Sequence, residues 1–356
     1  MAINSVKIIG SGLIGTSIGL ALSNKNIPVL MVDSDSSAQA LAQSLVDSDR
    51  SFDQKHTFDV VVLATPPSAF KSVLEREKEV NPSSTFVDIL SIKSKPQLEV
   101  EALADISTRF VGTHPMAGRE VSGPQSARGD LFVGRTWILC PSTSTSNQSR
   151  ALALELIDLC GAQALEMDAD EHDQAMALLS HAPQVIASLI AGQLREADRS
   201  WLNLVGQGFK DLTRIADSDA ILWREILSEN SSNVSQILKQ LRLQIEVLER
   251  ALADPNQAQI LIENGNEGRS LMPGKHGSTS RRYIYLHVVI DDKAGQLAAI
   301  FNDCASANVN IEDVSIEHTP GQNTGLVTLS ILDEKRAKIL QEYLISKHWK
   351  VHSTSK

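Results

Sequence analysis

The sequence has few cysteines, a deficit of positive charge and no long uninterrupted apolar segment. Its three cysteines, Cys140, Cys160 and Cys304, lie far apart without a CxxC pair. The odd number argues against a disulfide framework and favours a reducing, cytoplasmic compartment. Lys and Arg number 33 and Asp and Glu number 43, so the net charge is −10. Because nucleic-acid binding depends on basic surface, this balance argues against a nucleic-acid partner.

The N-terminal segment 7–23 is apolar, but glycines at positions 10, 12, 15 and 19 interrupt it. A signal peptide explains that spacing poorly. No other run reaches the ~18 uninterrupted apolar residues of a membrane span, so we expect no membrane partner.

At about 150 residues per domain, the 356 residues correspond to two domains, or to three smaller ones. Residues 1 to about 140 alternate between short β-branched segments and helical patterns, which indicates βαβ units and a parallel sheet covered on both faces. The strands that we expect are Val6–Ile9, Val29–Val32, Val60–Ala64, Thr85–Val87, Arg109–Gly112 and Trp137–Cys140.

From about residue 168 to 262 the strand pattern is absent and helical periodicity takes over. Asp168 and Asp170 precede a helix expected near Glu171, and a second long pattern covers about 220–252. A segment rich in Gly, Ser and basic residues then predicts a linker. The expected domains are a dinucleotide-binding domain over 1–165, a helical domain over 166–265, a linker over 266–281 and a small α+β domain over 282–356.

The C-terminal pattern predicts a βαββα module. Its expected strands and helices are Tyr283–Ile290, Gly295–Ala307, Val309–Ile316, Gly325–Leu332 and Glu334–Ser346, with a short last strand at Trp349–His352.

A glycine motif, GSGLIG at Gly10–Gly15, follows the first expected strand and opens a helical pattern. Gly10 allows a tight turn, Gly12 lets the backbone approach a pyrophosphate, and Gly15 lets the helix pack close to the strand. The N–H groups at the helix start, beginning with Leu13 and Ile14, then face the phosphates. The motif predicts a Rossmann-type domain.

Asp33 ends the second expected strand, 18 residues after Gly15. A carboxylate at this place accepts hydrogen bonds from the ribose of NAD and repels the 2′-phosphate of NADP. We therefore predict NAD as the cofactor. The alternative for Asp33 is a helix cap before Ser36.

Three further expected strands end in polar motifs. Thr65 and Pro66 belong to ATPP, Ser91 to DILSIK, and Thr113 and His114 to GTHPMAG. Ligands of open α/β sheets bind beyond the carboxyl ends of the strands. We therefore expect Thr65 and Pro66 over the cofactor, and Ser91 and His114 in one cleft beside it.

The chain resembles the prephenate dehydrogenase family over most of its length. The motifs that carry the resemblance are, in chain order, GSGLIGTSIGLAL, ATPP, DILSIK, GTHPMAGRE, LFVGRTW, EHDQAMALLSHAPQ, GFKDLTRIA and ILW at Ile221–Trp223. The family joins a dinucleotide-binding domain to a helical dimerisation domain, so the resemblance implies a homodimer. It also implies NAD-dependent oxidative decarboxylation of prephenate in tyrosine biosynthesis, a reaction that needs a base and a cation for a carboxylate but no metal.

The resemblance implies His114 as the base for the substrate hydroxyl, since the ordinary imidazole pKa of ~6.5 suits proton acceptance near neutrality. Ser91 is expected to hydrogen-bond this imidazole. Arg214, in GFKDLTR, is expected to hold a substrate carboxylate through its guanidinium fork. Trp223 is expected either at the edge of the site, reaching across the dimer, or in the core. Further cations beside the site, or in a solvated loop, are Arg119, Arg128 and Arg135.

The substrate pocket is expected to include Thr113, His172, Ser180, His181 and Gln184. His172 precedes His181 by nine residues, about 180° around a straight helix, so the chain must break or bend near Pro183 if both act. The family pattern ends in a second histidine where this chain has Gln184. A neutral amide tolerates either the keto acid of prephenate or the amino acid of arogenate, so the substrate stays open between these two.

The segments 291–297 and 308–312 resemble an ACT domain, a ferredoxin-like regulatory module that binds amino acids between paired copies. The usual proline before the turn glycine is Ala294 here. The expected effector is tyrosine, the end product, and the alternative is a module that dimerises without a ligand. Expected effector-binding residues are Asp292, Gly295, Gln296, Leu297, Asn310 and Ile311.

Two other classes of function compete with this interpretation. A β-hydroxyacid dehydrogenase has a similar first domain but uses a catalytic lysine, for which Lys210 is the nearest candidate. A non-catalytic sensor binds NAD and an amino acid without turnover. The presence of both His114 and Arg214 argues against the sensor.

Overall fold

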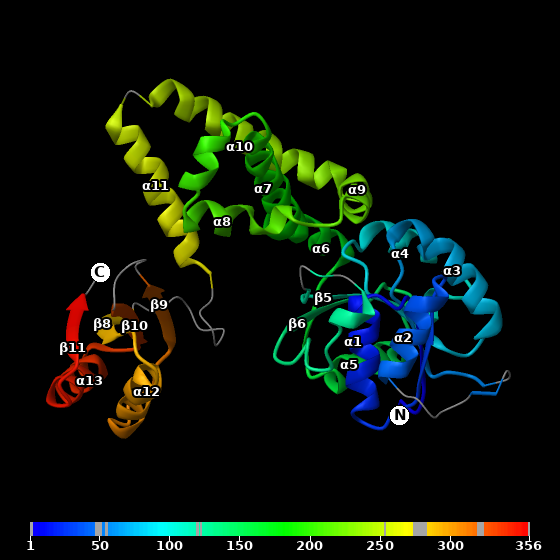
Figure 1. Ribbon diagram of the computed structural model, residues 1–356. Helices are drawn as coiled ribbons and strands as arrows, with labels where there is room; N and C mark the ends of the chain where they lie inside the picture. Colours follow the sequence, from blue (N-terminus) through cyan, green and yellow to red (C-terminus); the bar gives the residue numbers. More distant parts are fainter. Residues whose placement is uncertain are drawn as a thin grey trace. The chain divides into compact units, whose positions relative to one another are not determined.

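The computed structural model describes residues 3–46, 52–53, 56–118, 121, 123–252, 254–272, 283–318 and 324–354. The chain divides into two compact units, Met1–Gln244 and Ile245–Lys356. The first unit contains both the sheet expected at the N-terminus and most of the helical region (Figure 1).

The sheet of the first unit has seven strands in the order β2-β1-β3-β4-β5-β6-β7. Six of them match the predicted strands within a few residues, and the seventh, β7, was not predicted because all four of its residues are exposed and form no apolar run. The strands are β1 Val6–Ile9, β2 Val29–Val32, β3 Val60–Leu63, β4 Thr85–Asp88, β5 Phe110–Pro115, β6 Thr136–Cys140 and β7 Gln163–Glu166.

The expectation of an all-parallel sheet is wrong at one pair. β5 and β6 are antiparallel, whereas the other neighbouring strands of this sheet run parallel. Parallel neighbours need a long crossover, usually helical. In the described part of the β5–β6 connection, the 3₁₀ turn Pro124–Ser126 is the helical element, so the chain returns alongside β5 in the opposite direction.

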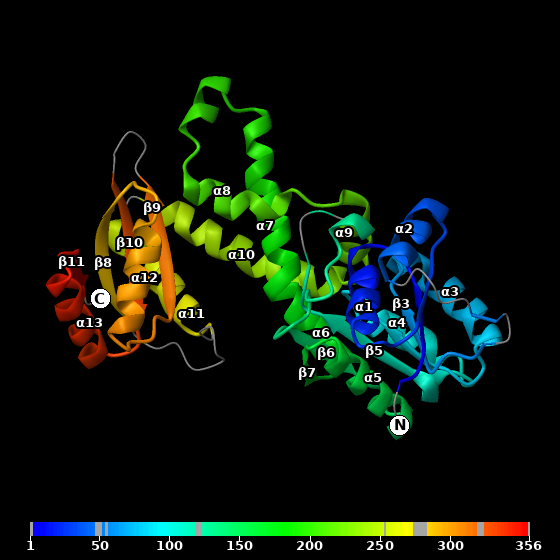
Figure 2. The same ribbon diagram turned by 60° about the horizontal axis from the view of Figure 1, so that its bottom comes forward.

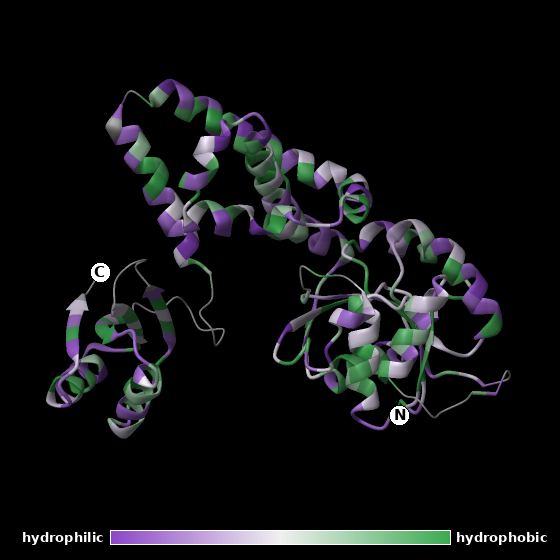
Figure 3. Cartoon of the chain, viewed as in Figure 1, coloured by the Kyte–Doolittle hydropathy of each residue, from purple (hydrophilic) through white to green (hydrophobic). Residues whose placement is uncertain are grey.

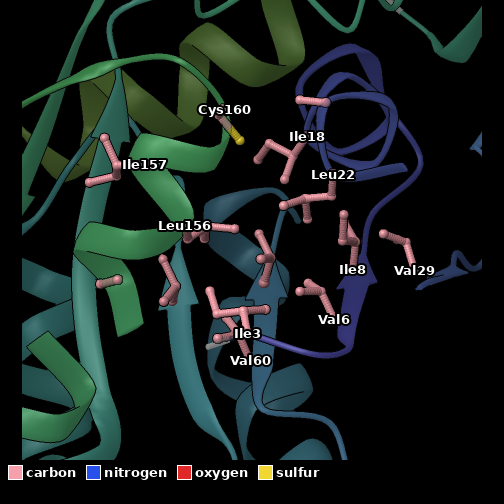
Figure 4. Close-up of a cluster of buried hydrophobic side chains, with 14 of the residues drawn as sticks. Ile3, Val6, Ile8, Ile18, Leu22, Val29, Val60, Leu156, Ile157 and Cys160 are labelled. Atoms are coloured by element: carbon pink, nitrogen blue, oxygen red, sulfur yellow. The ribbon is translucent and has the colours of Figure 1, made fainter. Parts of the chain in front are cut away.

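Helices cover both faces of this sheet because its strands are apolar at nearly every position. Val60 and Val62 of β3 point to the face covered by α1 (Leu13–Ser23) and α5 (Asn147–Leu159), whose side chains form the cluster in Figure 4. Val61 and Leu63 point to the face covered by α3 (Pro67–Val80) and α4 (Ser94–Glu101). Because β1, β3 and β4 run parallel to one another, their carboxyl ends meet at one edge of the sheet, as predicted.

The outer edge of strand β2 is covered by side chains of α2 (Ser36–Val46), which pair with backbone N–H groups there. Gln43 accepts a hydrogen bond from the N–H of Met31 at 2.8 Å, and Gln39 accepts one from the N–H of Asp33 at 2.9 Å. Pairing of these outward N–H groups removes a template for strand addition at this edge.

The helical region follows the sheet. It contains α6 (Ala169–Met176), a π-helical turn (Ala177–His181), α7 (Ala182–Gly192), α8 (Gln207–Thr213), α9 (Ala220–Glu229) and α10 (Ser231–Ala251), with short 3₁₀ turns between α7 and α9. The all-helical prediction for this region is confirmed. Figure 2 shows α6 and α7 running on from one another across the π-helical turn.

Helix α9 packs this helical region against the sheet domain. Ile226 of α9 is buried among the side chains of α3 and α4. Ser68 donates from its backbone N–H and its hydroxyl to the Glu225 carboxylate, at 3.1 and 2.9 Å, and Lys95 pairs with Glu229 at 2.6 Å.

The same region leaves many large apolar side chains exposed. Leu179, Trp201, Leu204 and Ile221 are each at least 63% exposed, and Figure 3 shows hydrophobic positions along these helices. Where exposed apolar side chains lie next to one another, they are typical of a surface that another protein covers.

The second unit contains α11 (Pro255–Ser270) and a βαββαβ module. The antiparallel sheet has the order β11-β8-β10-β9, and buried side chains of both helices pack against it. The predicted helices and strands all form, although the strand expected from Val309 begins at Asp313. Their bounds are β8 Ile284–Asp291, α12 Gln296–Ser306, β9 Asp313–His318, β10 Thr324–Ile331, α13 Glu334–Ser346 and β11 Lys350–Thr354.

The predicted linker over 266–281 is wrong at its beginning, because α11 continues to Ser270. Asp254 caps this helix by accepting the N–H of Asn256, and a proline occupies its first turn. Gly265 and Gly268 each cost about 1 kcal/mol relative to alanine but do not end it. Residues 273–281 of the predicted linker lie outside the described residues.

Candidate functional site

The glycine motif has the packing that a dinucleotide site requires. A Cβ on Gly10, where φ is +112°, would lie 2.1 Å from the carbonyl oxygen of Ala64, and a Cβ on Gly15 would lie 2.1 Å from that of Gly10. At Gly12, by contrast, a Cβ would meet no atom within 4 Å. Gly10 and Gly15 thus allow close packing, and Gly12 leaves open space before the N-terminus of α1, which no side chain caps.

Two buried hydroxyl groups beside this motif have no hydrogen-bond partner among the described residues. They are Oγ of Ser11, inside the motif, and Oγ1 of Thr65, at the end of β3. An unpaired buried polar group costs about 1–3 kcal/mol. A polar cofactor in the open space would remove that cost, so these residues fit a bound dinucleotide.

Asp33 lies next to the motif and is linked to it. Its carboxylate accepts the N–H of Ser11 at 2.6 Å and that of Asp35 at 2.8 Å. Asp35, rather than Asp33, accepts the N–H groups of Ser37 and Ala38 at the start of α2. The alternative of Asp33 as the helix cap is therefore wrong, and a contact of its carboxylate with the ribose of NAD stays a prediction.

His114 lies on β5 at the carboxyl end of the sheet and takes part in a chain of hydrogen bonds. Its Nδ1 lies 2.9 Å from Nε2 of His172 on α6, and Nδ1 of His172 lies 2.8 Å from a carboxylate oxygen of Asp173. Asp173 is fixed in turn by the N–H groups of Lys93 and Ser94, at 2.8 and 2.9 Å.

The protonation states along this chain follow from Asp173. Burial raises the pKa of Asp173, but hydrogen bonds from His172, Ser94 and Lys93 outweigh burial and hold the pKa below its usual value. The carboxylate therefore accepts the Nδ1 proton of His172. Burial lowers the pKa of His172, so its Nε2 carries a lone pair and accepts the Nδ1 proton of His114.

This arrangement leaves a basic nitrogen on His114. With Nδ1 donating, the lone pair of the neutral ring is on Nε2, which has no hydrogen-bond partner in the described part of the chain. Burial lowers the pKa of His114 well below its usual value, and His172, Lys93 and His181 lower it further. The ring is therefore neutral near pH 7 and able to accept a proton.

His172 differs from its predicted role. The sequence suggested that it contacts substrate, but it is completely buried and both its ring nitrogens are used, by Asp173 and by His114. It orients the His114 ring instead.

Ser91 lies just after β4 and is partly buried, near the same edge of the sheet. In the described structure no hydrogen bond joins Ser91 to His114, and His172 provides the one at Nδ1. An interaction of Ser91 with Nε2 of His114 or with substrate stays a prediction.

Thr113 is completely buried, and its hydroxyl donates to the backbone carbonyl of Asp88 and accepts from Trp137. The expected contact of Thr113 with substrate is therefore wrong for its side chain.

A π-helical turn provides the break that the positions of His172 and His181 require. The N–H of Ala182 reaches back five residues to the carbonyl of Ala177. Pro183 has no N–H to continue the α-helical pattern here, and π turns often lie at functional sites. The turn lets both histidines lie in the interior, where they are at most 1% exposed.

His181 is held by Asn230, between α9 and α10. The Asn230 amide donates to the backbone carbonyl of Asp173 at 2.7 Å and lies 3.1 Å from Nδ1 of His181. Burial lowers the pKa of His181 to about 4, so this ring is neutral. Trp223 packs edge-on against His181, with ring centroids 5.9 Å apart, and against the core. Trp223 is thus partly buried beside His181, and a contact of Trp223 across a dimer stays a prediction.

Gln184 lies on α7 one turn after His181. Its Nε2 donates to Oγ of Ser218 at 2.6 Å, so the amide is tied to the loop after the turn that holds Arg214. That turn, Arg214–Ala216, packs against α7, and Arg214 is exposed. The fold thus brings Arg214 next to α7, the helix that carries Gln184 and follows the turn with Ser180 and His181.

The other candidate cations are not drawn into the site. Arg128 pairs with Asp130, and Arg135 is exposed, as in a solvated loop. Arg119 lies outside the described residues.

Four residues of this site were missed in the sequence: Asp88, Lys93, Asp173 and Asn230. The signal for Asp88 and Lys93 was present, since they are opposite charges five residues apart in an otherwise apolar segment. Asp173 follows His172 directly. Nothing local marks Asn230, whose role depends on how α9 and α10 meet α6.

One helical stretch, Ala169–Arg195, is long and apolar enough to cross a membrane by length and composition. It carries buried, hydrogen-bonded His172, Asp173 and His181 and packs against the sheet domain. These features are those of a core helix.

The fold and the site together define a class of protein, an NAD-dependent dehydrogenase with a partly buried, neutral histidine at the carboxyl end of its sheet. Two family models match the chain: "Prephenate dehydrogenase, nucleotide-binding domain" over residues 18–166 and "Prephenate dehydrogenase, dimerization domain" over residues 168–263. The chain therefore belongs to the prephenate dehydrogenase family.

Individual relatives agree with this assignment. The chain is 32% identical to a probable prephenate dehydrogenase, NovF, of Streptomyces niveus, over 97% of this chain and 99% of the relative. It is 25% identical to the prephenate dehydrogenase of Bacillus subtilis, over 94% and 95%. The solved prephenate dehydrogenase of A. aeolicus, in complex with hydroxyphenyl propionate and NAD⁺, superimposes with a TM-score of 0.67 at 25% identity, covering 76% of this chain and 99% of that one.

Proposed function

We propose that the protein oxidises and decarboxylates prephenate, with Nε2 of His114 accepting the proton of the substrate hydroxyl. The observation that carries the proposal is the hydrogen-bond chain from Asp173 through His172 to His114, which leaves the basic nitrogen of His114 unpaired in the described structure. Proton acceptance by a positioned imidazole is the step that such a site supports.

The rest of the site supplies binding. Gly12, the start of α1, Asp33 and Thr65 would hold NAD, which accepts the hydride when bound. Arg214 holds a substrate carboxylate through paired hydrogen bonds. Loss of carbon dioxide then makes the ring aromatic and needs no further group from the protein.

Arogenate is the second candidate substrate, and Gln184 is the residue that supports this alternative. The amide is buried on α7 and donates to Ser218, so it is a fixed neutral group in the position where the family pattern has histidine. An amide can donate to a keto oxygen or accept from an ammonium group.

The test is NADH formation by the purified protein with prephenate and arogenate offered separately, each with NAD and with NADP. We expect turnover with prephenate and NAD and little with NADP, because the Asp33 carboxylate repels a 2′-phosphate. Turnover with arogenate alone would replace the substrate and keep the mechanism. No turnover with either substrate would favour a sensor without catalysis.

The exposed apolar side chains of the helical region support a homodimer as part of this proposal. A second copy would cover Leu179, Leu204 and Ile221, in the region matched by the dimerisation-domain model. A cytoplasmic location also belongs to the proposal.

We infer that the C-terminal module is an ACT-like regulatory domain that binds tyrosine between two copies. Gly295, with φ of +89°, begins α12 after β8. β8 and β9 are both antiparallel to β10, so residues just after β8 and residues just before β9 lie at opposite ends of the sheet. The two expected groups of effector residues, 292–297 and 310–311, therefore do not meet within one module, which supports a site shared by two.

Equilibrium dialysis of the full chain with labelled tyrosine tests this inference. We expect saturable binding that a bulky substitution at the turn, Gly295→Val, removes, since a β-branched residue is strained at positive φ. NADH formation without tyrosine should be unchanged in that variant. Absence of tyrosine binding to the unaltered chain would leave the module as a dimerising element.

A further inference from the structure

A buried ion pair lies close to His114. Asp88, the last residue of β4, and Lys93, in the loop that follows, have side chains 0% and 1% exposed, and Nζ of Lys93 bonds a carboxylate oxygen of Asp88. Neither side chain can reach solvent. A buried ion pair contributes little net stability compared with apolar side chains of similar volume. Stability alone therefore explains the pair poorly.

We propose that the Asp88–Lys93 pair is a positioning element for His114: it anchors the strand end that carries His114 and places a fixed positive charge beside the ring. This proposal rests on the proposed role of His114 as the base. Asp88 and Lys93 touch neither substrate nor cofactor in it; they act through the imidazole.

The anchoring is a set of hydrogen bonds on both sides of the pair. Asp88 accepts the backbone N–H of Thr113 at 2.7 Å, and its carbonyl accepts the Thr113 hydroxyl at 2.6 Å. Thr113 directly precedes His114. Lys93 donates its backbone N–H to Asp173, the far end of the chain that orients His114. The pair therefore joins the two elements whose separation sets the His114–His172 hydrogen bond.

The Lys93 side chain packs closely against Gly112 of β5, two residues before His114. A Cβ on Gly112 would lie 3.4 Å from Cδ of Lys93, at contact distance, and 3.3 Å from the carbonyl oxygen of Cys140. The lysine side chain is therefore in contact with the strand that carries His114.

The charges around His114 come from three elements. His172 and Asp173 face it from α6, His181 from the π-helical turn, and Lys93 from the loop after β4. Near neutral pH both other histidines are uncharged, since burial lowers their pKa values. The persistent charges are then Asp173, which raises the pKa of His114, and Lys93, which lowers it. Lys93 opposes the carboxylate and helps to keep the ring in its basic form.

The test uses the double variant Asp88→Asn/Lys93→Met, because Lys93→Met alone leaves a buried carboxylate unpaired and is strongly destabilising. The amide that replaces the Asp88 carboxylate still offers an oxygen to the N–H of Thr113. The pKa of His114 is read by NMR titration of the histidine-labelled chain, with the signal assigned by its loss in His114→Asn. We expect the pKa of His114 to rise, because the variant removes Lys93, which lowers this pKa, whereas Asp88, which is removed with it, is not among the main groups that shift it. The acid limb of kcat/KM should move to higher pH by the same amount.

Lys95→Met is the matched control, since Lys95 is exposed, pairs with Glu229 and lies two residues from Lys93. It should leave the His114 pKa unchanged. An unchanged His114 pKa in the folded double variant would overturn the proposal. The titration needs no substrate, so it gives this answer even if prephenate and arogenate are both inactive; that second result would contradict the proposed function instead.

Discussion

Replacement of His114 by asparagine is expected to lower kcat for prephenate by about 10²–10⁴-fold, the usual contribution of a positioned general base. Asparagine can still donate to Nε2 of His172 through its amide, so the surrounding hydrogen bonds need not collapse. It cannot accept the hydroxyl proton at the place of Nε2. Steady-state kinetics with saturating NAD measures the effect.

NAD affinity should stay within about twofold in this variant, because the cofactor residues lie on other strands. Fluorescence titration with NADH checks that. The control is His352→Asn, an exposed histidine of β11 in the second unit, for which turnover should not change. If His114→Asn kept normal turnover, the base would have to be another group.

Replacement of Arg214 by alanine is expected to lower kcat/KM roughly 30- to 150-fold, which corresponds to about 2–3 kcal/mol for a charge-assisted pair of hydrogen bonds. The loss should appear mainly as a higher KM for prephenate, because the carboxylate is held in both the bound substrate and the transition state. Initial rates over a range of prephenate concentrations separate KM from kcat.

Arg214→Lys distinguishes charge from geometry. Lysine keeps the positive charge but cannot form the two parallel hydrogen bonds of a guanidinium group, so we expect it to recover only part of the loss. Arg150→Ala, which removes an exposed arginine paired with Glu166 on the sheet domain, serves as the control. Equal KM values in Arg214→Ala and the unaltered chain would assign the carboxylate to another cation.

The sheet domain and the packing of the glycine motif could be predicted well because their signals are local. Continuous β-branched segments identify buried strands, and the spacing of Gly10, Gly12 and Gly15 has a direct steric reason that the packing around Ala64 confirms. The parallel direction of β6 was predicted wrongly, since strand direction depends on the path of a connection rather than on the strand itself. β7 carried no apolar pattern to find.

The histidines show which contacts local sequence patterns could predict and which they could not. Sequence spacing indicated that His172 and His181 need a break near Pro183, and the π-helical turn provides it. The same spacing did not reveal that His172 binds His114 instead of substrate, because that contact joins residues 58 positions apart. Asn230 likewise acquires its role from a contact with Asp173 across 57 positions.

The π-helical turn has a consequence for how this site can change through evolution. Such a turn holds about one residue more than an α-helical turn, so removal of one residue from Ala177–His181 would convert it into an α-helical turn and leave α7 in nearly the same orientation relative to α6. Gln184 would keep its place beside Ser218, and the contacts of His172 with His114 and Asp173 would be preserved. The residues of the turn itself, including Ser180 and His181, would change direction, so a change in chain length at this turn alters the interior of the site while both flanking helices stay in place.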